Sequence, residues 1–291
     1  MISGIKKIFS RGFEQHPSGK NIILTGIPRS GTTLSCKILL CAENQIALNE
    51  PIAAPLFKKG SPPGKVIRRC FSSYRKSLLK EGVAPVRTRE GKVTDNAYSS
   101  KGSSRKKVLE RSRVYFDKPL SKDFTLILKH CAEFTLILEE LKEEYECYAI
   151  VRNPLSILAS WSSVNVPVSR GKVAKSKLFR PDFYQKIEEL KSLEEKQIFI
   201  LDWYFSQYRK LGIERVIKYE DIIKSGGKAL SVVSGKEIHY HEELSNKNTN
   251  KVYDKNSILK YRDLLLNNKQ GNHLYFYTVE DIHSLAKQFG I

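Results

Sequence analysis

Short apolar runs alternate with amphipathic segments along most of the chain. Runs of strand length, rich in Ile, Leu and Val, predict buried strands at 22–24, 45–48, 124–128, 147–151 and 215–218. Apolar positions at helical spacing predict helices at 32–42, 132–145, 154–163, 182–211 with a break near Ser192, and 278–289. This alternation favours one α/β domain over residues 1–291, in which helices flank a central parallel sheet and ligands bind at the C-terminal ends of the strands.

The periodicity gives way to a basic segment between residues 60 and 113, which we interpret as an insertion in this domain. From 65 to 113, fifteen Lys and Arg residues stand against four Asp and Glu residues, which accounts for more than half of the net charge of +19. The stretch Y-S-S-K-G-S-S-R-K-K that begins at Tyr98 predicts a mobile loop. The insertion is either a solvated charged surface or a segment that binds an anionic partner.

The whole composition indicates an anionic partner and a reducing compartment. Lys and Arg number 50 against 31 Asp and Glu, which suits a nucleotide, an acidic glycan, nucleic acid or an anionic membrane surface. The five cysteines are odd in number and show no zinc-site spacing, and residues 1–12 lack the apolar core of a signal peptide. No apolar run approaches the roughly 20 residues of a membrane span. We therefore expect a cytoplasmic protein, with peripheral association to an anionic membrane left open.

The stretch N-I-I-L-T-G-I-P-R-S-G-T-T-L, residues 21–34, predicts a phosphate-binding loop between the first strand and the first helix. Gly26 and Gly31 have the spacing of G-x-x-x-x-G-K-[ST], but Thr32 stands where the lysine would be. At the start of a helix, backbone N–H groups and the helix dipole converge on an anion. The chain thus keeps the loop whose backbone binds an anionic group, but it lacks the lysine that contacts a β/γ-phosphate.

A second informative stretch, C-Y-A-I-V-R-N-P-L-S-I-L-A-S-W, places Arg152 at the end of a buried strand and Ser160 on the following helix. A planar guanidinium suits bidentate contact with a phosphate. Together with G-I-P-R-S-G-T-T-L, this stretch resembles the sulfotransferases that use 3′-phosphoadenosine 5′-phosphosulfate. The resemblance includes V-I-K-Y-E-D-I from Val216 and a last helix that closes on F-G-I, and it does not cover the basic insertion.

The resemblance implies a P-loop-like nucleotide-binding architecture, 3′-phosphoadenosine 5′-phosphosulfate as the co-substrate, and no metal. In that family an R-N-P…S pair holds the 3′-phosphate, a role that falls here on Arg152 and Ser160. The loop residues expected at the 5′-phosphosulfate are Pro28, Arg29, Ser30, Gly31, Thr32 and Thr33. By a looser resemblance, Tyr219 and the segment from Lys247 to Lys251 contact the nucleotide. A sulfuryl group carries less negative charge than a terminal phosphoryl group, so the absence of the lysine agrees with this interpretation.

The resemblance also implies an acceptor hydroxyl that attacks sulfur in line while a side chain takes its proton. Glu50 is the expected base, because it follows the second predicted strand, where the catalytic glutamate of tyrosylprotein and glycan sulfotransferases lies; the alternative is an exposed acid at a turn. His130 is the rival base, because small-molecule sulfotransferases carry K-T-H where this chain has Lys129 and His130 without a spacer. Lys129 matches the family lysine that neutralises the leaving-group oxygen.

Three functions are compatible with these features. A sulfotransferase acting on a carbohydrate or another anionic acceptor accounts for both motifs, and the insertion at 60–113 would then form an acceptor-binding lid. A P-loop kinase or NTPase is disfavoured by Thr32 and by the lack of a metal-binding aspartate at the end of an apolar strand. A basic nucleic-acid-binding protein explains the charge but not the two anion sites, and no specific nucleic-acid motif occurs. The sequence does not determine the acceptor or the oligomeric state.

Overall fold

The computed structural model describes residues 19–57, 62–99 and 105–291. Residues 1–12, to which the signal-peptide expectation refers, and residues 100–104 of the predicted mobile loop lie outside the described residues. Within the described ranges, no helix is long and apolar enough to cross a membrane.

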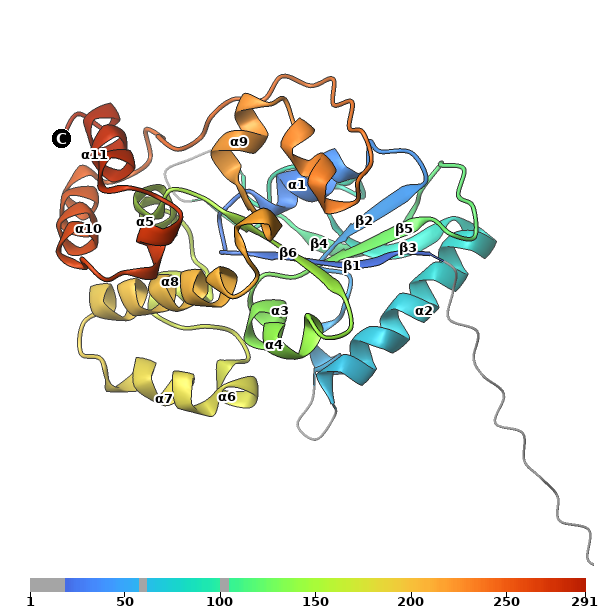
Figure 1. Cartoon of the computed structure of the whole chain (residues 1–291), viewed down its shortest axis with the longest axis horizontal. Helices are drawn as coiled ribbons and strands as arrows, with labels where there is room; N and C mark the ends of the chain where they lie inside the picture. The colour runs from blue at the N-terminus through green and yellow to red at the C-terminus, as the bar shows by residue number, and fades with distance from the viewer. Residues whose placement is uncertain (1–18, 58–61, 100–104) are drawn as a thin grey trace, which may run out of the picture.

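Five parallel strands form the central sheet in the order β2-β5-β1-β6-β7 (Figure 1). They are β1 (Asn21–Gly26), β2 (Gln45–Asn49), β5 (Thr125–Lys129), β6 (Glu146–Val151) and β7 (Val216–Lys218). Because all five run in one direction, their C-terminal ends meet at one edge, where Leu24 pairs with Lys129 and Gly26 with Ile150. This confirms the predicted α/β fold with a central parallel sheet flanked by helices.

Helices cover both faces of the sheet, which is why its strands form continuous apolar runs in the sequence. One face packs Leu24 and Ile150 with residues of α1 (Thr32–Leu39) and α9 (Tyr219–Lys224). The other face packs Ile23 and Ala149 into a larger core. In Figure 1, α1 and α9 lie above the sheet, whereas α3 (Ala132–Leu136), α4 (Leu138–Leu141) and α8 (Leu193–Arg209) lie below it.

The helix predicted at 132–145 is two short helices, α3 and α4, so that prediction was wrong in its length. Ile137 leaves the helical conformation, with φ −117° and ψ 21°. The pattern hid the break because Leu136, Ile137 and Leu138 are all buried, and the apolar run continues through it.

The predicted break near Ser192 is confirmed, and it separates α7 (Pro181–Glu189) from α8. The Ser192 hydroxyl accepts a hydrogen bond from the N–H of Glu195 at 3.2 Å, and the Glu195 carboxylate accepts one from the N–H of Ser192 at 2.9 Å. This reciprocal capping box stabilises the start of α8. The remaining α-helices outside the basic insertion are α5 (Pro154–Ser162), α6 (Ser176–Phe179), α10 (Lys255–Asn267) and α11 (Val279–Gln288) in the described part of the chain.

The basic insertion contains regular structure that the sequence analysis did not predict. It forms a long helix, α2 (Pro63–Glu81), and an antiparallel hairpin of β3 (Val83–Thr88) and β4 (Glu110–Tyr115). One face of α2 is buried through Ile67, Phe71 and Leu78, and Arg75 is buried as well, with Nε donating to Oδ1 of Asn21 at 2.8 Å. Much of the insertion is therefore packed against the domain.

Candidate functional site

The loop between β1 and α1 is fixed by close backbone contacts. Gly31 precedes α1 with φ 92°, and a Cβ at this position would lie 2.6 Å from the ring of Tyr219. The position therefore requires glycine for both conformation and space. The hydroxyl of Ser30 donates to the backbone carbonyl of Ile150 at 2.8 Å, so this side chain joins the loop to β6.

Of the remaining loop residues, one stabilises the loop and the others line a cavity of about 380 Å³. The carbonyl of Pro28 accepts a hydrogen bond from the indole N–H of Trp161 at 2.8 Å. Thr32, Thr33 and Arg29 line the cavity. The N-terminal end of α1 thus faces this space, as an anion-binding helix start would.

Arg152 follows β6 and is held almost entirely by neutral acceptors. Its Nε donates to Oδ1 of Asn248 at 2.7 Å. Its terminal nitrogens donate to the backbone carbonyls of Arg29, at 3.1 Å, and of Lys247. The guanidinium lies 4.6 Å from the centre of the Tyr219 ring. Arg152 is only 4% exposed, and it forms no ion pair with a carboxylate of the described residues.

The side chain of Arg29 turns toward the same place. Its backbone has φ 78°, and its Nε donates to the hydroxyl oxygen of the fully buried Ser160 at 3.1 Å. The guanidinium also lies 4.4 Å from the centre of the Tyr98 ring. Burial lowers the pKa of Arg29 to about 10, with Tyr98 opposing and Arg152 adding to the shift. Arg29 was expected at the 5′-phosphosulfate. Its side chain instead contacts Ser160, and its backbone carbonyl accepts a hydrogen bond from Arg152.

These two arginines give the cavity an unbalanced positive charge. Buried guanidinium groups without a carboxylate are unfavourable, and an entering anion would relieve that cost. The arrangement therefore fits a ligand that has one anionic group at the start of α1 and another beside the two arginines. The charged side chains that line the cavity are Arg29, Arg105, Arg152, Lys247, Asp95 and Glu243.

Two residues that the sequence analysis did not single out hold Arg152 in place. The amide Nδ2 of Asn248, whose oxygen accepts from Arg152, donates to Oε1 of Glu220 at 2.8 Å. Glu220 also accepts from the N–H of Asn153 at 3.0 Å and from the hydroxyl of Tyr277 at 2.8 Å. The Y-E-D stretch was a signal for Glu220, whereas Asn248 lies in the 247–251 segment, which was expected to contact the nucleotide and not to orient Arg152.

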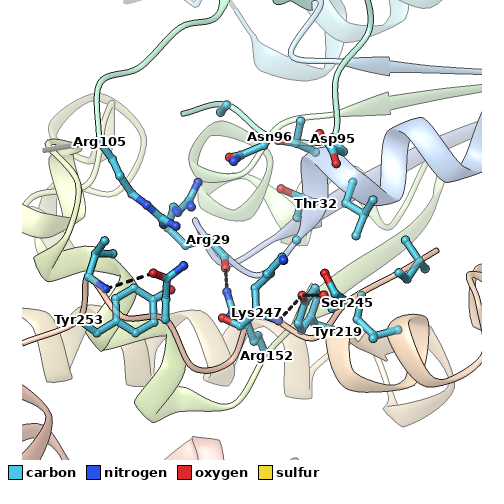
Figure 2. A pocket seen from close by; sticks show the side chains of 18 of the residues that line it. Arg29, Thr32, Asp95, Asn96, Arg105, Arg152, Tyr219, Ser245, Lys247 and Tyr253 are labelled. Carbon is cyan, nitrogen blue, oxygen red and sulfur yellow. Dashed lines mark hydrogen bonds between the residues drawn. The ribbon is translucent and has the colours of Figure 1, made fainter. Parts of the chain in front are cut away.

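The basic insertion forms one wall of the cavity. Figure 2 shows Asp95 and Asn96 on the opposite side of the cavity from Tyr219 and Lys247. Arg105, which follows the segment 100–104, extends its side chain toward Arg29 in the same view. Part of the insertion therefore lies over the proposed nucleotide site, a contact that the sequence analysis did not predict.

The two looser nucleotide candidates have different surroundings. Tyr219 lines the cavity, and its hydroxyl accepts from the N–H of Lys247 at 3.1 Å. Lys251 is exposed and is absent from the cavity lining, although Asn250 and Val252 on either side of it belong to that lining. Lys247 is therefore better placed than Lys251 to contact a ligand in this cavity.

Glu50 stands in the turn after β2, with φ 49°. Its N–H donates to the carbonyl of Lys129 at 2.8 Å, its Oε1 lies 3.4 Å from the Lys129 ammonium, and its Oε2 lies 3.8 Å from Nε of Arg87. Burial would raise the pKa of Glu50, but the surrounding positive groups outweigh burial and lower it to about 2. The cations responsible are Lys129, which has the largest effect, followed by Lys107 and Arg87. Glu50 is therefore ionised at neutral pH.

Lys129 ends β5 and is buried, with 1% of its surface exposed. Its ammonium donates to Oδ1 of Asn49 at 3.1 Å and faces Glu50. Burial alone would lower the pKa of Lys129, but Cys131 and Glu50 raise it above its ordinary value. The chain thus holds a cation in a fixed place at the C-terminal end of the sheet, beside the loop that follows β1.

Both ring nitrogens of His130 contact other residues of the protein. Its Nε2 accepts a hydrogen bond from the N–H of Ile52 at 3.1 Å, so the ring proton is assigned to Nδ1, which lies 3.6 Å from Oε2 of Glu133. The ring is buried between Phe57 and Phe134. Neither nitrogen is positioned to take a proton from an acceptor without breaking one of these contacts.

Tyr98 of the insertion connects the cavity to this second group of residues. Its ring covers the guanidinium of Arg29. Burial raises the pKa of the Tyr98 hydroxyl, Arg29 opposes that shift, and Glu50 adds to it. The charges of Arg29 and Glu50 therefore both act on Tyr98. Among the described residues, no group of three or more His, Cys, Asp or Glu side chains is arranged to hold a metal ion.

Comparison with known proteins gives little independent information. No protein-family model matches the chain, and no curated protein matches it. A solved structure, the sulfotransferase domain from the Synechococcus PCC 7002 olefin synthase, is similar over 95% of this chain and 97% of that chain, with 15% sequence identity and a TM-score of 0.34. Because this TM-score is low, function has to be argued from the residues of the site.

Proposed function

We propose that the chain is a sulfotransferase that moves the sulfuryl group of 3′-phosphoadenosine 5′-phosphosulfate to an acceptor hydroxyl, with a carbohydrate as the proposed acceptor. One observation carries the proposal: a phosphate-type loop without its lysine shares a cavity with the buried Arg152 and the partly buried Arg29, and neither arginine has a carboxylate partner among the described residues. A nucleotide with separate 3′ and 5′ anionic groups suits that pair of sites. A nucleoside triphosphate, whose charge is concentrated in one chain, suits it less.

In this proposal the cavity residues hold the donor at its two ends. Arg152 and Arg29, with Ser160 behind them, bind the 3′-phosphate through guanidinium donors. Thr32, Thr33 and the N–H groups at the start of α1 bind the 5′-phosphosulfate. The donor supplies the activated sulfuryl group, and the protein supplies its position.

The transfer itself is assigned to Glu50 and Lys129. The Glu50 carboxylate takes the proton of the acceptor hydroxyl while that oxygen forms the new bond to sulfur. On the opposite side of sulfur the bond to the phosphate oxygen breaks, and the electron pair stays on that oxygen. The Lys129 ammonium stabilises the resulting charge. His130 is the weaker candidate base, because its two nitrogens are occupied by Ile52 and Glu133.

Thermal unfolding tests the donor assignment against the two rival functions. We expect 3′-phosphoadenosine 5′-phosphate to raise the melting temperature, and ATP with Mg²⁺ or an unrelated oligonucleotide to raise it less at the same concentration, because ligands stabilise the folded state in proportion to their affinity. A larger shift with ATP and Mg²⁺ would favour a kinase or NTPase. A larger shift with the oligonucleotide would favour a nucleic-acid-binding protein.

A further inference from the structure

The hairpin of the basic insertion brings two arginines together beside Glu50. Arg87 of β3 and Arg111 of β4 are directly opposite partners in the antiparallel pair. Opposite residues of such a pair project from the same face, and like charges in that position are destabilising. Burial and the neighbouring charge of Arg87 both lower the pKa of Arg111. The fold therefore holds two cations together at some cost.

The contacts of the two arginines differ. Arg111 donates to the backbone carbonyls of Pro51 and Glu50, so it supports the turn that carries Glu50. The side chain of Arg87 approaches Glu50 at 3.8 Å from Nε to Oε2, and this Nε has no hydrogen-bond partner among the described residues. Its Nε is buried, although 28% of the side chain is exposed. A buried donor without a partner is uncommon in folded proteins and calls for an explanation.

Positive charge around Glu50 exceeds what one carboxylate can balance. Lys129 and Lys107 act on Glu50 along with the two arginines. The nearby carboxylate of Glu133 faces His130 instead. If Lys129 serves the leaving oxygen, Glu50 is the one carboxylate among the described residues that forms an ion pair with Arg87, and Arg111 and Lys107 form none.

We propose that Arg87 and Arg111 bind a carboxylate or sulfate group of the acceptor, next to the hydroxyl from which Glu50 takes the proton. This inference rests on the proposed function and narrows it to acceptors that are already acidic. A guanidinium presents paired donors that match the oxygens of such a group, and Nε of Arg87 has no hydrogen-bond partner among the described residues. The bound anion completes the charge balance of the reaction centre.

The same contact would improve Glu50 as a base. An anion beside Arg87 and Arg111 offsets the positive charges that hold the Glu50 carboxylate in its ionised form. The proton affinity of Glu50 then rises toward that of an ordinary carboxylate, which favours proton transfer from a hydroxyl. An acidic acceptor would thus both bind more tightly and react faster than a neutral one.

Binding calorimetry with three acceptor probes tests the inference, in the presence of saturating 3′-phosphoadenosine 5′-phosphate and at fixed ionic strength. The probes are an octasaccharide of alternating glucuronic acid and N-acetylglucosamine, its carboxyl-reduced neutral form, and the neutral form after chemical sulfation. The variant is Arg87→Gln, and the control is Arg69→Gln, which removes one exposed charge of α2 within the same insertion. Melting temperatures establish that both variants are folded.

We expect the unaltered protein to bind at least one acidic probe about tenfold more tightly than the neutral probe, because one charge-assisted hydrogen bond contributes about that much affinity. Arg87→Gln should remove most of that preference, and Arg69→Gln should retain it. The tighter of the two acidic probes identifies the group as carboxylate or sulfate. Equal binding of all three probes, absence of binding, or an equal preference in the two variants would overturn the inference. A separate titration of each protein with 3′-phosphoadenosine 5′-phosphate alone measures nucleotide binding, so failure of the proposed function would be seen there as absent nucleotide binding.

Discussion

Glu50 has a backbone conformation and an electrostatic environment that few surface glutamates share. The positive φ of 49° turns its side chain out of the strand direction, and its two carboxylate oxygens face Lys129 and Arg87. Non-glycine residues in this conformation are uncommon and often lie at functional sites. These features support Glu50 as the proposed base over an exposed acid at a turn.

Replacing Glu50 by glutamine keeps the shape of the side chain but removes its ability to accept a proton. We expect turnover with labelled donor to fall by roughly 10²–10⁴, as for loss of a general base, with nucleotide affinity little changed. His130→Ala should lower turnover much less, once corrected for the fraction of folded protein. If His130→Ala abolishes turnover while Glu50→Gln retains it, the roles are reversed.

The dependence of kcat/KM on pH independently tests the role of Glu50 as the base. Because the pKa of Glu50 is lowered to about 2, its ionised form is lost only as the pH falls toward that value. We therefore expect no loss of activity from this group between about pH 5 and pH 8. A histidine base would instead lose activity as the pH falls below the neutral range.

Residue identities at strand ends were predictable because they depend on short stretches of sequence. Glu50, Lys129 and Arg152 each follow an apolar run, and parallel strands bring such ends to one edge. The direction of the Arg29 side chain was not predictable, because it follows from a positive φ. The hydrogen bond from Ile52 to Nε2 of His130 was not predictable either, because Ile52 is distant in sequence and close only in the fold.

At the scale of elements, the segment after α9 closes the cavity and orients Arg152. Asn248 accepts from Arg152 and donates to Glu220 at the start of α9, and its own carbonyl accepts from the hydroxyl of Ser156 on α5 at 2.9 Å. The segment is thus tied to two helices that flank the sheet. Its position, more than its composition, gives it a role in the site.

Asn248→Ala removes the acceptor that fixes Nε of Arg152. We expect affinity for 3′-phosphoadenosine 5′-phosphate to fall about tenfold, since a hydrogen bond to a charged group contributes about 1.5–3 kcal/mol, while affinity for AMP changes little. Calorimetry of both nucleotides measures the difference. Asn256→Ala, at an exposed position on α10, serves as the control. An equal loss of affinity for both nucleotides would mean that Asn248 does not act through Arg152.

The elements of the sheet were predicted well, and those of the insertion were not. Strands buried on both faces produce apolar runs that identify them without long-range information. In α2 the buried Ile67, Phe71 and Leu78 do recur at helical spacing, but Arg and Lys residues around them suggested a solvated loop. The charge of a segment describes its exposed face and does not exclude a buried one.

At the scale of the whole molecule, the insertion contacts both halves of the site. Its segment around Asp95 and Arg105 lies over the nucleotide cavity, whereas Arg87 and Arg111 of its hairpin lie beside Glu50. The insertion carries more than half of the net charge of +19, and part of that charge lies where an anionic donor and an acidic acceptor would meet in the proposed function. Composition predicted an anionic partner, and only the fold locates the charge.

The central claim is that one cavity holds two separate anion sites, and Arg152 tests it most directly. Calorimetry should show that the unaltered protein binds 3′-phosphoadenosine 5′-phosphate more tightly than AMP by a factor on the order of ten to a hundred, the value of one charge-assisted phosphate contact. Arg152→Ala should bring the two affinities close together without unfolding the protein. Equal affinity for the two nucleotides in the unaltered protein, or an unchanged preference in Arg152→Ala, would contradict the claim.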